Sequence, residues 1–489
     1  MSELNLKLFG KNSVIYAIGN LSLRGSSFLL IPLYTHFLSI SDYGLLATLI
    51  LTIQVLITFM DLGTRKSFIR FAAEYEEQGL MGTFLGSTIF LRLVGSAVII
   101  AAAVLFFNPL FARILHMEDV FDYVILTCMA AFAQSMCYTI LGYYRARNEG
   151  MKYMGSSFVV IIILTIMTAI FLVPLKMGVK GVMYAQIFAY GVAWLFLSAK
   201  IFSVTGVGFS KKIARQLLSF GLPLIFMMSG YLIMDTSVVY LLSFFLDLEE
   251  VGIYSLGYKL AQISGILLIA PFQLAYEPFI YANLNRPDIK ETIARLLTYL
   301  MFIFTILSVI LVFIFRDLLS IIAPIEYKDA YLIMFLVLPG LAFKAGHNIG
   351  QSLLLIHKKS HIAGSIIAVF TVINLFLQYT LIPLFGKYAA VLVVDFTLIS
   401  ILITYMIIGR RYVPIPIEKP RLIITALIFI GLMSFIFLMS FQQSFIFYSV
   451  VPLVVSGTIV TLYRSQFLST NEKVFLKGIY QRLAEAVSH

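Results

Sequence analysis

Long apolar runs alternate with short polar segments along the whole chain. Most runs are about 20 to 30 residues long, which suits a membrane-spanning helix and exceeds the length of a barrel strand. The pattern predicts an all-α polytopic membrane protein with about 14 transmembrane helices. The spans are expected at residues 14–37, 44–64, 82–107, 121–144, 153–174, 181–203, 217–246, 252–280, 294–315, 330–356, 361–383, 388–409, 422–440 and 445–463.

The pattern repeats after about 208 residues. SDYG at 41–44 matches EEVG at 249–252, just before a span, and LVPL at 172–175 matches LIPL at 381–384, at the end of one. Each match is weak alone, but the shared offset indicates an internal duplication. Because a repeat of six spans keeps both halves in one orientation, we expect two parallel six-helix bundles around a central cavity near the bilayer midplane.

Polar segments mark the expected domain boundaries. A stretch rich in Gly, Ser and Lys at 203–215 predicts a cytoplasmic linker, and the Pro-rich loop Val413–Pro416 precedes two spans outside the repeat. Near the C-terminus, Lys473, Lys477 and Arg482 alternate with apolar residues, which predicts an amphipathic helix on the membrane surface. The expected domains are an N-terminal bundle (1–203), a cytoplasmic linker (204–216), a C-terminal bundle (217–411), two additional transmembrane helices (412–464) and a cytoplasmic amphipathic tail (465–489).

Composition agrees with this interpretation. The 489 residues are 61% hydrophobic and 12% charged, whereas a soluble domain is about half apolar and about a quarter charged. The net charge of +11 does not indicate nucleic-acid binding, because most Lys and Arg fall in alternate loops, following the positive-inside rule. We therefore expect a multi-pass protein of the inner (cytoplasmic) membrane with both termini in the cytoplasm. The first apolar run is too long for a cleavable signal.

Catalytic and metal chemistry find little support in the sequence. Six histidines are scattered, and neither an HExxH pair nor a Gly-rich phosphate loop occurs. Cys128 and Cys137 lie in one apolar run without metal-ligand companions. We therefore expect a transporter without catalytic residues, metal or cofactor. Since no ATP site is recognisable, energy would come from the substrate gradient, the membrane potential or coupling to H⁺ or Na⁺.

Four basic residues lie well inside apolar runs: Arg24, Arg92, Lys259 and Lys344. A cation at the bilayer centre is costly and needs a carboxylate, a water-filled cavity or an anionic ligand. Arg24 is about ten residues into its span, or about 15 Å from the end, and its Ser and Gly neighbours make that face polar. For Arg24 we favour contact with an anionic substrate over a structural ion pair.

The other cations allow two interpretations. Lys344 is similarly central, and His347 at i+3 shares roughly one helix face with it, so both are candidates to line a binding cavity. Neutral core packing is the alternative for His347. Lys259 and Arg92 are also candidates for substrate binding, but each lies near enough to a span end to extend its charge to the membrane surface instead.

Two carboxylates lie within spans, Asp235 in 217–246 and Asp395 in 388–409. Each would either neutralise a buried cation or bind H⁺ or Na⁺ for coupling. Asp235 is the first candidate for coupling. Asp61 and Glu277 lie at span ends, where a solvated carboxylate is expected.

Several motifs give the chain a resemblance to the polysaccharide flippases of the multidrug/oligosaccharidyl-lipid/polysaccharide exporter superfamily. They include YAIGNL at 16–21 leading to Arg24, IPLYTHFLS at 31–39, DYG at 42–44 and LPG at 338–340, and the resemblance covers essentially the whole chain. It implies two six-helix bundles plus two further helices, alternating access, and a polyprenyl-diphosphate-linked glycan as ligand. Arg24 matches an arginine in the first helix of the related peptidoglycan-precursor flippases.

The leading hypothesis is a flippase that moves lipid-linked oligosaccharide from the cytoplasmic to the outer leaflet for cell-surface polysaccharide or lipopolysaccharide biosynthesis. Its expected partners are the lipid-linked substrate and membrane lipids, with other polysaccharide-assembly proteins as a further hypothesis. An ion-coupled multidrug exporter on the same scaffold is the alternative, although an excess of buried cations disfavours cationic drugs. A glycan polymerase or ligase is less favoured, because no outer loop is long enough to hold a reactive centre.

Overall fold

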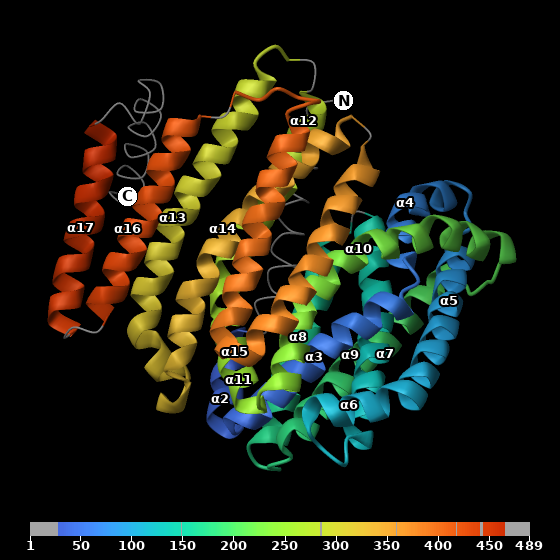
Figure 1. Ribbon diagram of the computed structural model, residues 1–489. Helices are drawn as coiled ribbons and strands as arrows, with labels where there is room; N and C mark the ends of the chain where they lie inside the picture. Colours follow the sequence, from blue (N-terminus) through green and yellow to red (C-terminus); the bar gives the residue numbers. More distant parts are fainter. Residues whose placement is uncertain are drawn as a thin grey trace, which may run out of the picture. The chain divides into compact units, whose positions relative to one another are not determined.

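A computed structural model describes residues 28–147, 149–283, 286–357, 359–416, 418–440 and 444–464 (Figure 1). These residues form sixteen α-helices with short π and 3₁₀ segments, and no β-strand occurs among them. Ten of the described helices are long and apolar enough to cross a membrane, and the bent helix α10 makes eleven. The predicted all-α polytopic membrane fold is confirmed.

The helices fall into two compact units, Met1–Tyr281 with Asp317–Tyr412, and Ala282–Arg316 with Val413–His489. The first unit contains α2 (Ile31–Phe37), α3 (Ile40–Met60), α4 (Thr64–Glu77), α5 (Met81–Ala102), α6 (Asn108–Leu115), α7 (Phe121–Ala146), α8 (Gly150–Leu172), α9 (Gly178–Thr205), α10 (Lys211–Phe245), α11 (Leu248–Ser264), α12 (Ala270–Ala282), α14 (Asp329–Leu355) and α15 (Ser360–Gly409). The second contains most of α13 (Ile289–Ile322), with α16 (Lys419–Ser440) and α17 (Ser444–Arg464). Both predicted six-helix bundles lie mainly in the first unit, so their boundaries stay a prediction.

Helix bounds follow the predicted spans with one notable difference. The spans expected at 361–383 and 388–409 are both parts of α15, which runs for 50 residues. They meet at Gly386, whose φ of 63° and ψ of −148° are not helical. Glycine adopts this conformation without a steric penalty, so α15 is kinked at Gly386 into two helical parts. Most of the first predicted span and the predicted tail at 465–489 lie outside the described residues.

Helix α10 is bent. Its two straight parts, Lys211–Ile225 and Ser229–Phe245, meet at 53°. Pro223 lies just before the bend, and a proline removes a backbone donor and clashes with the preceding turn. The bend therefore has an identifiable cause in the sequence.

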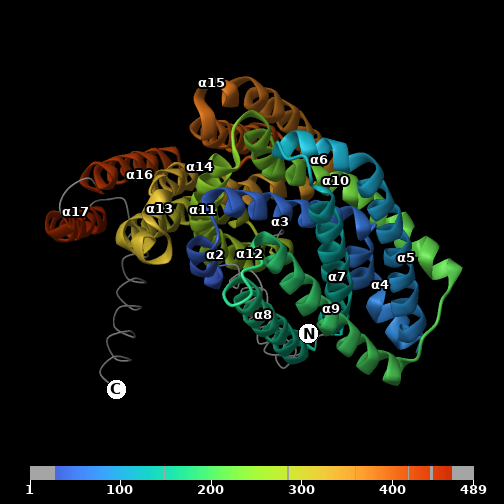
Figure 2. The ribbon, with the colours of Figure 1, turned by 90° about the horizontal axis from the view of Figure 1, so that it is seen from below.

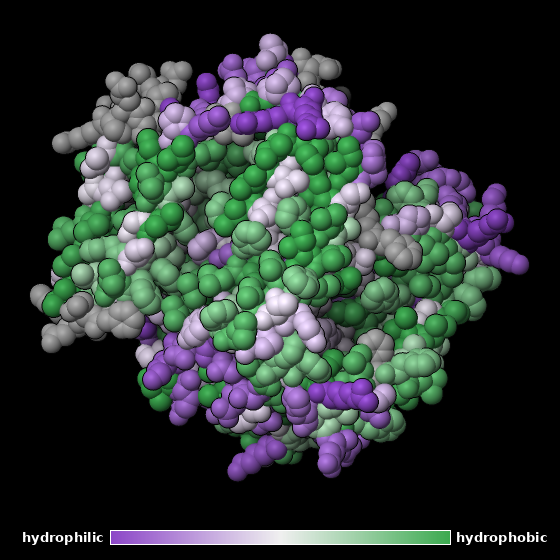
Figure 3. Space-filling view, in the orientation of Figure 1, coloured by the Kyte–Doolittle hydropathy of each residue, from purple (hydrophilic) through white to green (hydrophobic). Residues whose placement is uncertain are grey.

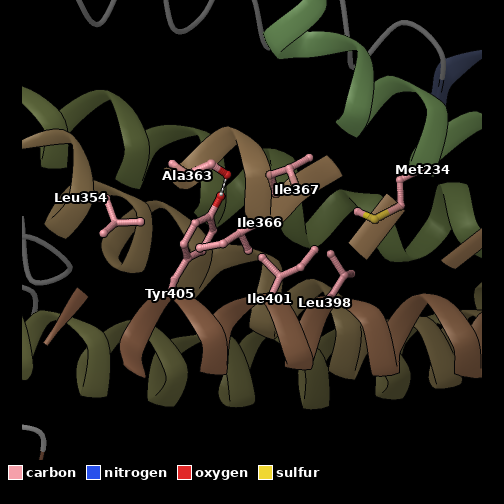
Figure 4. Packing of buried hydrophobic residues seen from close by; sticks show 8 residues of the cluster. All are labelled: Met234, Leu354, Ala363, Ile366, Ile367, Leu398, Ile401 and Tyr405. Carbon is pink, nitrogen blue, oxygen red and sulfur yellow. Dashed lines mark hydrogen bonds between the residues drawn. The ribbon is translucent and has the colours of Figure 1, made fainter. Parts of the chain in front are cut away.

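Within the first unit, α3 runs between α11 and α7, as Figure 2 shows. Helix α14 packs against α15 and α11, and α9 packs against α7 and α8. One cluster of buried side chains joins α10, α14 and α15 (Figure 4): Met234, Leu354, Ala363, Ile366, Ile367, Leu398, Ile401 and Tyr405. The Tyr405 hydroxyl donates to the Ala363 carbonyl at 3.2 Å, so the buried hydroxyl of this cluster has a hydrogen-bond partner.

The crossing of α3 and α11 depends on two glycines. A Cβ atom on Gly44 would lie 1.9 Å from the Leu248 carbonyl oxygen, and one on Gly252 would lie 2.4 Å from the Ile40 carbonyl oxygen. The two contacts are reciprocal, since each glycine meets the carbonyl four residues before the other. Gly44 and Gly252 are also equivalent in the sequence repeat. Their reciprocal contact is consistent with an internal two-fold relationship between the two halves.

Outward-facing side chains on the long helices are largely apolar. Figure 3 shows hydrophobic residues along the helices and hydrophilic ones gathered toward their ends. Leu105 and Phe106 on the segment after α5, and Phe196 on α9, are each at least 70% exposed. Such residues are unfavourable in water but fit the hydrocarbon core of a bilayer.

The long apolar runs of the sequence do not predict two of the helices, α4 and α6. Helix α4 buries Phe68 and Ala72 while exposing Arg65, Lys66 and Arg70. This amphipathic pattern, three to four residues apart, was the available signal. Helix α4 directly follows α3 and packs against α7 and α10, so it belongs to the first unit.

Candidate functional site

The predicted chamber rests on Arg24, Arg92, Lys259 and Lys344. Arg24 lies outside the described residues, so its substrate-binding role stays a prediction. The other three belong to the first unit, on α5, α11 and α14. The same unit contains the two predicted coupling carboxylates and His347. Each of these side chains has a distinct environment, and the differences decide which of them can receive a ligand.

Arg92 is held inside the protein by several partners. Its side chain is 1% exposed, and Nη2 lies 2.8 Å from Asp61 Oδ1. Nε donates to Thr64 Oγ1 at 3.0 Å, while Nη1 donates to the Ser135 carbonyl at 2.8 Å. The expectation that Arg92 extends to the membrane surface is therefore wrong. Because its donors serve α3, α4 and α7, this geometry favours a structural role, and substrate binding by Arg92 stays an untested prediction.

Asp61 also differs from expectation. It was expected to be solvated at a span end, yet it is 8% exposed. It is the C-cap of α3, and it accepts from Thr64 Oγ1, the Arg65 backbone N–H and Arg92 through the same oxygen, Oδ1. These donors, with the Arg92 guanidinium among them, compensate the carboxylate for the water that it loses on burial.

Lys344 forms an ion pair with Asp235. Its Nζ lies 2.9 Å and 3.0 Å from the two carboxylate oxygens, joining α14 to α10. Both side chains are partly exposed to solvent, Lys344 by 30% and Asp235 by 41%. The pair is thus neutral overall but reachable. Charge pairing is one of the two roles predicted for Asp235, and this geometry supports it.

His347 faces a different helix from Lys344. It is 3% exposed, and Nε2 lies 2.7 Å from the Leu398 carbonyl on α15. Because a carbonyl only accepts, Nε2 carries the proton. Its ring also meets Tyr405 edge to face, with centroids 6.1 Å apart. These contacts favour the core-packing alternative, and cavity lining by His347 remains a prediction without support here.

Asp395 is a buried carboxylate of α15. It is 8% exposed, and its carboxylate lies against the backbone of Gly340 on α14. A Cβ atom at position 340 would lie 1.9 Å from Asp395 Oδ1, so only glycine leaves room for this approach. Beside it is a cavity of about 10 Å³, lined in part by Tyr254 and Tyr258. Among the described residues, no Lys or Arg forms an ion pair with Asp395.

Lys259 is the cation of this group without a carboxylate partner in the described part of the chain. It lies on α11 and is half-buried. Its Nζ is 5.9 Å from the ring centroid of Tyr34, a 3% exposed residue on α2. A cation over a tyrosine face gains about 0.5–2 kcal/mol, which is less than the cost of removing an ammonium from water. The positive charge of Lys259 is therefore not compensated by a carboxylate among the described residues.

Residues 9–283, more than half of the chain, match the profile of a family described as "Polysaccharide biosynthesis protein". The chain belongs to this family. The match includes Arg92, Asp235 and Lys259 but ends before Lys344 and Asp395. A search of curated proteins found no match for this polysaccharide biosynthesis family member.

Solved structures share the fold of this family member. The lipid II flippase MurJ in an inward closed conformation has a TM-score of 0.66 at 14% identity, covering 94% of this chain and 99% of that chain. An inward-facing multidrug resistance MATE transporter of the MOP superfamily has a TM-score of 0.63 at 14% identity, covering 81% and 94%. The Vibrio cholerae MATE transporter VcmN in its bent form has a TM-score of 0.54 at 16% identity, covering 86% and 98%. At such identities the likeness shows the fold alone.

The three described cations of the candidate site in this family member differ in how their charge is compensated. Arg92 is neutralised by Asp61, and Lys344 is neutralised but accessible. Lys259 keeps its charge uncompensated among the described residues. Asp61 and the glycine at position 340 were not recognised as site elements from the sequence, although the Pro339-Gly340 pair was a visible signal of interrupted helix.

Proposed function

We propose that this chain is a flippase that moves a polyprenyl-diphosphate-linked oligosaccharide from the cytoplasmic to the outer leaflet by alternating access. It acts in the inner membrane, with both termini in the cytoplasm, and supplies cell-surface polysaccharide such as lipopolysaccharide. Membership in a polysaccharide biosynthesis family supports this proposal, as does a fold shared with MurJ, which is described as a lipid II flippase.

Lys259 is the observation that carries the proposal. An ammonium group that is half-buried within an apolar helix, with no described carboxylate in reach, is costly unless a ligand brings the counter-charge. A diphosphate carries at least two negative charges and several acceptor oxygens, so it can compensate the charge of Lys259 and accept its hydrogen bonds.

The Lys344–Asp235 pair extends the same chemistry. Because both side chains are partly exposed, an incoming diphosphate can compete with Asp235 for Lys344. A buried or half-buried pair gains little net stability, so exchange of one anion for another is inexpensive. In this proposal the substrate bridges Lys259 and Lys344, and Arg24 provides a third contact.

Transport against a gradient needs an energy source, and we propose coupling to H⁺ or Na⁺. Asp235 and Asp395 are the carboxylates assigned to it. Membrane lipids and the lipid-linked substrate are the proposed partners, and contact with other polysaccharide-assembly proteins is part of the same proposal.

The test compares Lys259→Ala with Lys259→Arg in vesicles. The assay measures how fast a fluorescent polyprenyl-diphosphate oligosaccharide becomes accessible in the opposite leaflet. Loss of a charge-assisted hydrogen bond costs about 1.5–3 kcal/mol, so Lys259→Ala should reduce the rate about ten- to hundredfold. Lys259→Arg keeps the charge and should retain most of the rate.

Lys200→Ala is the matched control, because Lys200 is an exposed lysine near the end of α9. It should flip substrate at the parental rate. A parental rate for Lys259→Ala, at equal protein in the vesicles, would remove the observation on which the proposal rests. If the same variants instead alter efflux of cationic drugs while lipid flipping is absent in the parent, the multidrug exporter is the correct function.

A further inference from the structure

The structure describes three carboxylates of the candidate site, Asp61, Asp235 and Asp395. Asp61 is paired with Arg92, and Asp235 is paired with Lys344. Asp395 has no ion-pair partner among the described residues, although it is 8% exposed. A carboxylate in this position either stays protonated or loses much of the solvation that its charge needs. Asp395 therefore differs from Asp61 and Asp235 because it has no cationic partner among the described residues.

The packing around Asp395 is specific. Its Oδ1 rests on the bare backbone of Gly340, where a Cβ atom would approach to 1.9 Å. No Lys or Arg among the described residues forms an ion pair with this carboxylate. An ionised carboxylate in an apolar interior costs several kcal/mol, which this packing does not compensate.

A small cavity adjoins this carboxylate. It has a volume of about 10 Å³ and is lined by Asp395, Tyr254, Tyr258 and apolar side chains. This is close to the smallest space that holds one water molecule, and Asp395 in its lining is a polar partner for such a water. A proton needs such a carrier to enter or leave a buried group.

The charged and titratable groups around Asp395 do not replace a counter-ion. Helix α10 contributes Asp235 and α14 contributes Lys344, but these two neutralise each other. Helix α11 contributes Tyr254 and Tyr258, which are uncharged at neutral pH. His347 of α14 is neutral, since Nε2 donates to the Leu398 carbonyl and Nδ1 has no hydrogen-bond partner among the described residues.

We propose that Asp395 is the carboxylate that binds and releases the coupling proton, through the water-sized cavity beside Tyr254 and Tyr258. This inference rests on the proposed flippase function and assigns its coupling ion. One proton binds the Asp395 carboxylate from the water on one side of the membrane and leaves to the other side, so no other reactant is consumed. Asp235, the first candidate from the sequence, instead holds Lys344.

The structure suggests how protonation reaches the helices. Asp395 Oδ1 packs directly on the Gly340 backbone and so joins α15 to α14 at the Pro339-Gly340 step. Protonation removes the charge of this carboxylate and with it much of the need for solvation at the contact. The contact between α14 and α15 thus becomes sensitive to the state of one group. Since α14 also carries Lys344, proton release and substrate contact share a helix.

The experiment uses the full-length protein in two measurements. Infrared spectroscopy of the purified protein, titrated with pH, should show a protonated-carboxyl band that is lost in Asp395→Asn. In vesicles, an imposed pH gradient should accelerate flipping by the parent, whereas Asp395→Asn should flip at one rate with or without the gradient. Asp119→Asn is the control, because Asp119 is an exposed loop carboxylate that should change neither result.

Several outcomes overturn the proposal. They are a protonated-carboxyl band that persists unchanged in Asp395→Asn, a gradient response that survives in that variant, and acceleration by a sodium gradient at constant pH. If the parent flips no lipid, the flippase function fails while the infrared titration still tests the proton site. Should Asp395→Asn not accumulate, Asp395→Glu takes its place, and an unmoved carboxyl band then contradicts the assignment.

Discussion

Alanine at Gly44 or Gly252 is expected to force α3 and α11 apart where they cross. At Gly44 the added Cβ would lie 1.9 Å from the Leu248 carbonyl oxygen, whereas ordinary contacts begin at 3.4 Å. The helices must therefore separate by about 1.5 Å locally, because a backbone carbonyl cannot rotate away as a side chain does. Inserting atoms into a packed interface costs about 1–3 kcal/mol.

The assay is thermal unfolding of the purified protein in detergent, combined with flipping in vesicles. Gly44→Ala and Gly252→Ala should each lower the unfolding temperature. The double variant should lose less than the sum of the two, since one separation of the helices relieves both clashes. If the contact belongs to only one of the alternating states, the same 1–3 kcal/mol shifts the balance between states about five- to 150-fold, which changes the flipping rate.

Gly191→Ala provides the matched control. A Cβ at Gly191 of α9 meets no atom within 4 Å, so alanine there should leave stability unchanged or raise it slightly. Equal unfolding temperatures for Gly44→Ala and Gly191→Ala would refute the reasoning. Additive losses in the double variant would show that the two glycines do not share one crossing.

Two further predictions concern the paired carboxylates. Asp61→Asn leaves the Arg92 charge buried without a counter-ion and should destabilise the protein by about 3–5 kcal/mol, measured as a lowered unfolding temperature; stability equal to the parent would contradict the ion pair. Asp235→Asn frees Lys344 and should tighten binding of a soluble diphosphate probe, measured by calorimetry. Weaker binding of that probe would show that Asp235 positions Lys344 rather than competing with the substrate.

Much of the fold could be predicted because the hydropathy of each segment can be read directly along the sequence. The cost of placing a residue in hydrocarbon depends on its own side chain, so the span expected at 121–144 is observed as Phe121–Ala146. Local rules fail where the context decides. The turn at Gly386 within α15 and the amphipathic helix α4 depend on the backbone conformation and on packing, which a run of apolar residues does not encode.

The candidate site was less predictable, because charge partners depend on how helices are tilted and rotated. Arg92 and Asp61 are 31 residues apart in sequence and meet only through the α3–α4 turn. His347 was expected to share a face with Lys344, yet a step of three residues turns the helix by about 300°. That offset of about 60° is enough for Lys344 to meet α10 and for His347 to meet α15. The spacing of Lys344 and His347 therefore predicts that they lie close together, but not which neighbouring helix each side chain contacts.

The distribution of these charges bears on which substrate the protein can accept. A chamber in which every cation had a carboxylate would have no preference for an anion, and one with a surplus carboxylate would favour cationic drugs. Among the described residues, Arg92 and Lys344 are compensated while Lys259 is not, and Asp395 avoids adding negative charge when it is protonated. The balance among these described groups is then positive by Lys259 alone. In the proposed mechanism, protonation of Asp395 preserves that balance and ionisation removes it, which would link the coupling proton to the anionic substrate through electrostatics.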